Sequence, residues 1–309
     1  MAWNALVILL VGVALAAEWT VEAGADIAPS SHGVLNLWRV EGPWSGGLYT
    51  DTLELRYAPS NARGRAWAAV RGEGGAAGLM ISPWSEGAPD PDSAVSASYA
   101  GVEGGGLRYL PRGFYAGAQG SARFYAFSGV YADRPQATVD ALFGYWSEGI
   151  QGWSRVGVDA WPGQVSPHAH VQLSARPDWR IAPRAEIRAG WGLNQDPVTR
   201  TRLGGINPYV VPLAGAGWGE FWVEDYAAAR VGGGFAGERF EADLLVDAVV
   251  FDGQRAAGFG VDTTTHWGPN ALEVAAGFSP FIERKPGVAP ATGWVLYRRT
   301  WGAPLSSSS

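Results

Sequence analysis

Hydrophobic and polar residues alternate through residues 238–252 in a pattern that predicts a two-faced β-strand. The apolar positions are Phe240, Ala242, Leu244, Val246, Ala248 and Val250, and the charged positions are Arg239, Glu241, Asp243 and Asp247. Because side chains alternate across a strand, each set lies on its own face. Such a strand suits the wall between lipid and a wet lumen. Leu245 and Val249 are the exceptions on the charged face.

The same alternation recurs in residues 50–57, 168–176 and 184–193, and more weakly in 138–146, 154–161 and 220–228. One such run would also suit a half-buried strand of a soluble sandwich, so the repetition carries the interpretation. We therefore expect a lumen lined by charged residues. Those singled out are Arg184, Glu186, Arg188, Arg239, Glu241, Asp243 and Asp247.

The number and length of these runs predict an all-β fold, a closed antiparallel transmembrane β-barrel. Bacterial single-chain barrels use even strand numbers, so we predict 14–16 strands, with 12 as the fallback. Long loops are expected at residues 84–93, 195–216 and 280–291. The glycine runs 104–106 and 232–234 are expected to form hairpin turns.

The N-terminus predicts export. An apolar core from Leu6 to Val13 precedes the small-x-small sequence Ala14-Leu15-Ala16, so residues 1–16 are expected to be a signal peptide. The first four residues lack Lys and Arg, which is unusual, and a membrane anchor is the alternative. A spanning helix, however, needs about 20 apolar residues. The barrel is then expected over 17–301, followed by a disordered tail at 302–309.

The composition of the chain limits the classes of partner that it could bind. A net charge of −6 and a pI of about 5.3 argue against nucleic acid, because a basic patch is the usual footprint of its binding. The chain has no cysteine and 16 tryptophans, many of which lie near the ends of candidate strands. Aromatic residues at strand ends are typical of the girdles of membrane barrels. A secreted carbohydrate-binding protein with stacking tryptophans is the alternative.

The last third of the chain carries, in this order, Arg202-Leu203-Gly204-Gly205, a long loop through Asn207-Pro208-Tyr209, Val246-Asp247-Ala248, Gly258-Phe259-Gly260 and Gly268-Pro269. This order, over about residues 200–301, resembles the C-terminal barrel strands of BamA-like outer-membrane proteins. The resemblance implies a loop that folds into the lumen, with Gly204, Gly205, Asn207 and Tyr209 as its candidate residues. It also implies assembly by the barrel-assembly machinery, for which a final strand that ends in an aromatic residue is the usual signal. Trp301 ends the last predicted strand, but eight residues follow it, which departs from that signal.

Two departures from that family limit what the resemblance implies. The family's lumenal loop carries an Arg that anchors to the barrel wall, whereas residues 206–216 contain no Arg. The family's periplasmic POTRA modules would precede the barrel, yet strand patterning starts directly after the expected cleavage site. The resemblance therefore supports the fold and the membrane more than a protein-insertion activity.

Candidate chemistry is sparse. His168 and His170 share a strand face, but nothing in sequence completes a metal site around them. Ser31-His32 are adjacent and so point to opposite faces, which disfavours a nucleophile and base pair. Asp243 and Asp247 lie about 13 Å apart along a strand, too far for an acid/base pair. We predict no catalytic residue, no metal and no cofactor.

The sequence thus predicts a monomeric, non-enzymatic barrel in the outer membrane of a Gram-negative-type bacterium, in contact with outer-membrane lipid. It would act as a narrow pore or translocation channel, or as a membrane scaffold, with a charged lumen. Two alternatives remain open, a secreted soluble all-β carbohydrate-binding protein and an outer-membrane hydrolase.

Overall fold

The computed structural model describes most of the chain between residues 17 and 302. The described residues are 17–28, 32–50, 52–74, 79–81, 84–85, 88–89, 95–128, 131–196, 198–206, 210–217 and 219–302. The expected signal peptide at 1–16 lies outside these residues, as does the expected tail beyond Gly302.

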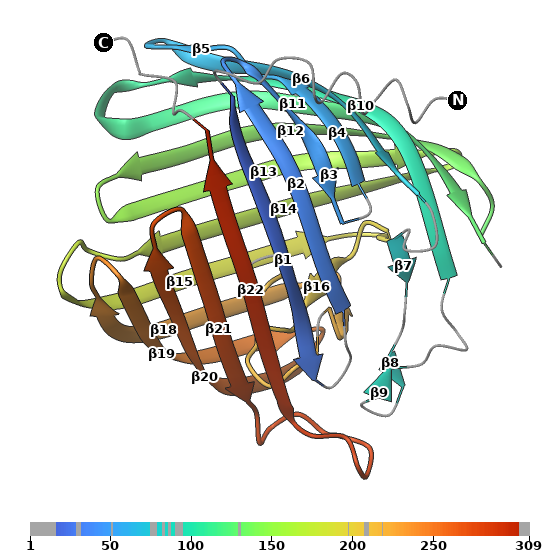
Figure 1. Cartoon of the computed structure of the whole chain (residues 1–309). Helices are drawn as coiled ribbons and strands as arrows, with labels where there is room; N and C mark the ends of the chain where they lie inside the picture. Colours follow the sequence, from blue (N-terminus) through green and yellow to red (C-terminus); the bar gives the residue numbers. More distant parts are fainter. Residues whose placement is uncertain are drawn as a thin grey trace, which may run out of the picture.

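Sixteen antiparallel strands of the described chain form one closed wall (Figure 1). In chain order they are β1 (Glu18–Ala28), β2 (His32–Glu41), β3 (Trp44–Tyr49), β4 (Thr52–Tyr57), β6 (Gly64–Glu73), β10 (Val95–Tyr109), β11 (Phe114–Phe127), β12 (Arg134–Ser147), β13 (Ile150–Trp161), β14 (Gln164–Ala175), β15 (Ile181–Gly192), β18 (Tyr226–Ala236), β19 (Phe240–Phe251), β20 (Gln254–Trp267), β21 (Asn270–Phe278) and β22 (Ala291–Trp301). Each pairs with the next, and β22 pairs with β1 from Trp19↔Trp301 to Ala28↔Gly293. The predicted closed barrel is confirmed at sixteen strands, above the fallback of 12.

The remaining described elements are short. They are β5 (Ser60–Asn61), β7 (Leu79–Ile81), β8 (Trp84–Ser85), β9 (Ala88–Pro89), the 3-10 turn η2 (Pro111–Gly113), β16 (Thr201–Leu203) and β17 (Phe221–Val223). Within the described ranges, no helix is long and apolar enough to cross a membrane.

The wall strands have an apolar outer face and a largely polar inner face. On β19, Leu244 is 70% exposed and Val250 57% exposed, whereas Asp247 between them is fully buried. Leu245 and Val249, the two apolar residues of the charged face, are buried on the inner side of the strand. Large apolar side chains are exposed all around the wall, far beyond the patches that soluble monomers tolerate. The outer face therefore suits a lipid surround.

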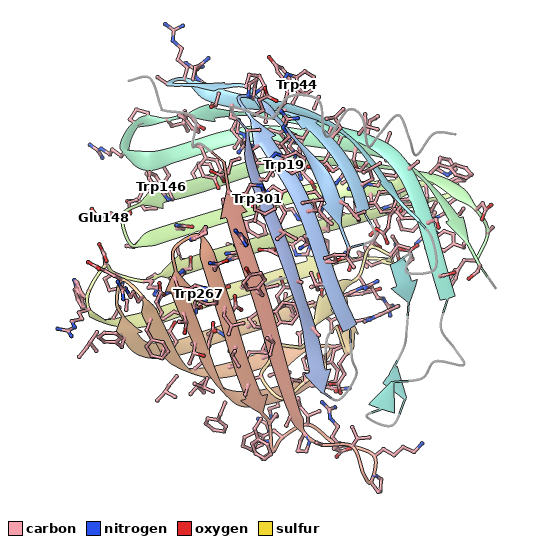
Figure 2. The ribbon with its side chains drawn as sticks, in the orientation of Figure 1. Trp19, Trp44, Trp146, Glu148, Trp267 and Trp301 are labelled. Carbon is pink, nitrogen blue, oxygen red and sulfur yellow. The ribbon has the colours of Figure 1, made fainter. Side chains whose placement is uncertain are left out.

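Aromatic residues gather at the end of the barrel where β1 begins and β22 ends. Trp19, Trp44, Trp267 and Trp301 all lie near that end of their strands (Figure 2), and Trp44 packs on Tyr57 with ring centroids 4.7 Å apart. This position suits an amphipathic ring at a membrane interface.

Trp294 differs from these girdle residues. Although it lies near the start of β22, it is fully buried and packs inside the barrel beside Ile206 and Ala214 of the loop between β15 and β18. Its place on the inner face follows from strand parity, since Leu296 two residues later is also buried.

The glycine runs 104–106 and 232–234 lie inside β10 and β18, so the expectation of hairpin turns there is wrong. The short distances to groups on the neighbouring strands explain why glycine occupies these positions. A Cβ on Gly234 would lie 2.4 Å from the Asp243 carboxylate, and one on Gly105 would lie 2.5 Å from the Trp67 ring. These glycines admit the close approach of groups on the adjacent strands, a known reason for glycine within a strand.

The connections differ between the two ends of the barrel. At the end with the aromatic residues, consecutive strands are joined by short turns, such as 42–43 and 268–269. The opposite end carries the long connections at 74–94, 193–225 and 279–290. Membrane barrels show this asymmetry, with short periplasmic turns and longer extracellular loops.

Candidate functional site: the lumen and its inserted loop

Part of the connection between β15 and β18 folds into the barrel. We call the described residues 203–206, 210–217 and 219–220 of this connection the inserted loop. Leu203, Leu213 and Ala214 in it have no exposed surface, and Gly204 and Gly205 are also buried. Among the predicted loop residues, Asn207 and Tyr209 lie outside the described residues. These apolar residues of the inserted loop pack against apolar residues on the inner face of the wall, such as Val249 and Trp294.

A carboxylate of the wall holds the middle of the inserted loop. Asp247 on β19 accepts a hydrogen bond of 2.8 Å from the backbone N–H of Ala214. The same carboxylate accepts two hydrogen bonds from Arg230 on β18, at 2.6 and 2.9 Å. Both side chains are buried, and a bidentate Arg–carboxylate pair is the strong form of such a contact. The Arg at this contact, Arg230, therefore belongs to the barrel wall, whereas the inserted loop itself has no Arg.

A second Arg reaches the inserted loop from the connection between β21 and β22. Arg284 donates to the carboxylate of Glu220, at 2.6 Å for one contact, and to the carbonyl of Gly215 at 2.9 Å. Glu220 in turn accepts a hydrogen bond of 2.8 Å from the Gly217 N–H. Burial raises the pKa of the Glu220 carboxyl, against the opposing influence of Arg284 and the Gly217 N–H. Two loops far apart in sequence are thus joined.

Glycines on β20 and β21 form the seat on which the inserted loop rests. A Cβ on Gly258 would lie 2.0 Å from the Ala214 carbonyl oxygen, and a Cβ on Gly277 would lie 2.9 Å from the Gly215 nitrogen. Neither position allows any other residue without movement of the loop backbone. The Gly-x-Gly sequence of β20 therefore serves close packing of the loop against the wall.

Replacing Gly258 by alanine is expected to displace the inserted loop and to cost about 1–3 kcal/mol of folding free energy, the usual effect of overpacking. Trypsin should then cut after Arg202, which is protected while the loop is seated. The matched control is Gly233→Ala on β18, where the nearest atom to a new Cβ is 3.5 Å away. Equal trypsin resistance of both variants would contradict this description of the seat.

The remaining predicted lumen residues fall into three places. Arg188 donates to the Val210 carbonyl at 3.1 Å and also pairs with Glu186 beside it on β15, so both lie next to the inserted loop. Arg184 reaches Asp243 at 3.4 Å across the glycines of β18. Glu241 pairs at 2.9 Å with Arg176, the residue that follows the end of β14.

Arg239 does not belong to this set. It lies in the turn between β18 and β19 and is exposed, one residue before the strand begins. Its assignment to the lumen wall is therefore corrected. In sequence, the alternation of charged and apolar residues extends back to Arg239, but in the structure this residue belongs to the turn before β19.

A buried polar cluster on the other side of the lumen was not anticipated from sequence. His168 on β14 lies between two carboxylates, with Nε2 2.7 Å from Asp140 on β12 and Nδ1 3.0 Å from Asp159 on β13. His170 is buried beside it. Strand alternation places each residue on the inner face, but only the registers of β12, β13 and β14 bring them together. The described residues hold no group of three or more potential ligands arranged to bind a metal ion.

This cluster borders a cavity of about 180 Å³ in the part of the lumen that the inserted loop leaves open. The lining is mostly polar and includes Glu103, Gln119 and Arg123 together with His168. Arg123 also lies over the Tyr99 ring, 5.2 Å from its centroid. A space lined in this way can hold water or small polar solutes.

No protein-family model matches the chain, and no curated protein matches it. Solved structures do. BamA from Haemophilus ducreyi, in a form lacking POTRA domains 1–3, aligns with a TM-score of 0.68 at 9% identity, over 93% of this chain and 70% of that one. CdiB from Acinetobacter baumannii gives 0.65 at 8% identity over 92% of this chain, and CdiB from Escherichia coli gives 0.55 at 11% identity over 92%.

This chain spans 60% of the length of the Acinetobacter CdiB chain and 63% of the Escherichia coli one. Identity is low throughout, so the likeness concerns the arrangement of the strands. The expected resemblance to BamA-like barrels, which rested on the last third of the sequence, is confirmed and extends over nearly the whole chain. The chain has the sixteen-stranded barrel fold of BamA and CdiB.

Proposed function

We propose that this chain is a bacterial outer-membrane β-barrel whose lumen is a narrow, non-enzymatic translocation pathway occluded by the inserted loop. The observation that carries the proposal is the anchoring of that loop by Asp247 and Arg284 within a closed wall. The apolar outer face and the aromatic end support the membrane setting. The short-turn end would face the periplasm, as in other membrane barrels.

The pairing of lumen charges supports a pathway whose selectivity depends on side-chain charge. Arg56 and Arg71 share the carboxylates of Glu54 and Glu103, with contacts from 2.6 to 3.1 Å on the inner faces of β4, β6 and β10. Fixed charges that line a pore set its ion selectivity. We expect the open part of the lumen to be narrow and weakly conducting.

The surroundings of His168 support a non-enzymatic role. A general base needs a free ring nitrogen facing a nucleophile, whereas both nitrogens of His168 face carboxylates. The pair that the hydrolase alternative considered, Ser31 and the side chain of His32, lies outside the described residues. The soluble carbohydrate-binding alternative is disfavoured by the apolar wall, because soluble monomers rarely expose so many leucines and valines.

Partners follow from this setting. The barrel would contact outer-membrane lipid through its wall and would be inserted by the barrel-assembly machinery. Trp301 at the end of β22 is the expected aromatic signal for that machinery. We propose a monomer, because the closed wall leaves no sheet edge for a second copy to pair with.

Single-channel recording in planar bilayers tests the proposal. The wild-type chain is expected to show small, intermittent conductance, and Gly258→Ala should raise it several-fold by displacing the inserted loop. Gly233→Ala serves as the control and should match the wild type. Silent bilayers for all three proteins would contradict a pathway and favour a membrane scaffold.

A further inference from the structure

A second cavity, of about 400 Å³, lies between the inserted loop and the inner faces of β13, β14, β15 and β18. Its described lining includes Arg155, Arg188, Arg200, Arg202 and His170, and no Asp or Glu. Glu186 and Glu224, which pair with Arg188 and Arg200, lie outside this lining. The chain as a whole carries a net charge of −6, so the positive charge of the cavity surface is local. The first cavity is different, since Glu103, Asp140 and Asp159 line it.

Three of these arginines have partners that hold them in place. Arg188 donates to the Val210 carbonyl at 3.1 Å, Arg200 pairs with Glu224 at 3.1 Å, and Arg202 stacks on the Trp222 ring 5.3 Å from its centroid. They are therefore pre-positioned around the cavity, which lowers the entropy cost of binding a ligand.

Arg155 is different. It lines both cavities, forms no ion pair with any described residue, and has a buried Nε with no hydrogen-bond partner. The side chain as a whole is half-buried, but a buried N–H donor without an acceptor is costly unless an anion or water pairs with it. The planar fork of Arg matches the oxygen pairs of phosphate and carboxylate groups.

We propose that this cavity binds a small multivalent oxyanion of the oligophosphate class, with Arg155 as its principal contact. Thr201, which also lines the cavity, supplies a hydroxyl donor. The volume falls within the range of about 300–1,000 Å³ that is usual for small-molecule sites. The inference rests on the proposed function only in that the ligand would enter through the lumen.

Isothermal titration of the full chain in zwitterionic detergent tests the site, with inorganic tripolyphosphate as the probe in a phosphate-free buffer of low ionic strength. The wild type is expected to bind saturably. Arg155→Gln should weaken binding about tenfold or more, the effect of losing a charged hydrogen bond. Arg63→Gln removes the same charge from an exposed turn and should leave the affinity unchanged.

Heat-dependent gel mobility verifies that each variant is a folded barrel before titration. Absence of saturable binding to the wild type would overturn the proposal, and so would equal affinity of the wild type and Arg155→Gln. Equal saturable binding of the cation spermine would also overturn it. The titration requires no ion flow, so a barrel that binds tripolyphosphate but is silent in bilayers refutes the proposed pathway and leaves this site standing.

Discussion

Replacing Asp247 by alanine is expected to lower the free energy of unfolding by about 3–5 kcal/mol, because the buried guanidinium of Arg230 would lose its bidentate partner. The backbone N–H of Ala214 would lose its acceptor in the same step. We therefore expect loss of stability together with release of the inserted loop. Urea unfolding in detergent measures the first effect, and trypsin cleavage after Arg202 measures the second.

The double variant Arg230→Met with Asp247→Ala separates the two effects. Removing both charges eliminates the uncompensated guanidinium, so most of the stability should return. The Ala214 N–H still lacks its acceptor, so the loop should remain sensitive to trypsin. If Asp247→Ala were as stable and as protected as the wild type, Asp247 would not be the anchor of the loop.

Replacing Leu244 by arginine is expected to destabilise the membrane-inserted barrel by about 2–4 kcal/mol, the cost of an Arg on the lipid face near the midplane. Leu244 is 70% exposed and lies in the middle third of β19. In a soluble protein, the same change at so exposed a position would have almost no effect. Reversible unfolding in lipid vesicles measures the difference.

Gln254→Arg is the matched control, because Gln254 is exposed at the hairpin end of β20 and lies away from the middle of the wall. Its cost should be small, about 0–1 kcal/mol as found near the interfaces. Equal small costs at Leu244 and Gln254 would mean that the apolar face of β19 does not contact lipid.

The sequence predicts the wall well because each strand carries its own period-two pattern. Leu244 and Asp247 face opposite sides of β19 for a reason visible within that strand alone. The barrel follows from the repetition of the pattern, and closure follows from the need to pair every edge in lipid. Strand ends are less well predicted, and Arg239 shows why. The alternation of residue types continues into the turn before β19.

Contacts within the lumen depend on registers and loop paths that no local pattern encodes. The anchor pair Arg230–Asp247 joins β18 to β19, and Arg284 reaches Glu220 from a loop 64 residues away. The carboxylates around His168 come from two other strands. Glycine runs mislead for the same reason, because close approach between strands and a tight turn both favour glycine.

Oxygen accessibility along β19 tests the membrane barrel most directly. The chain has no cysteine, so single cysteines at residues 242 to 250 can each carry a spin label without background. In lipid vesicles, we predict a period of two, with high oxygen accessibility and low accessibility to a water-soluble nickel complex at positions 242, 244, 246, 248 and 250. Uniform access of the nickel complex to those positions, or no period at all, would contradict a lipid-facing wall.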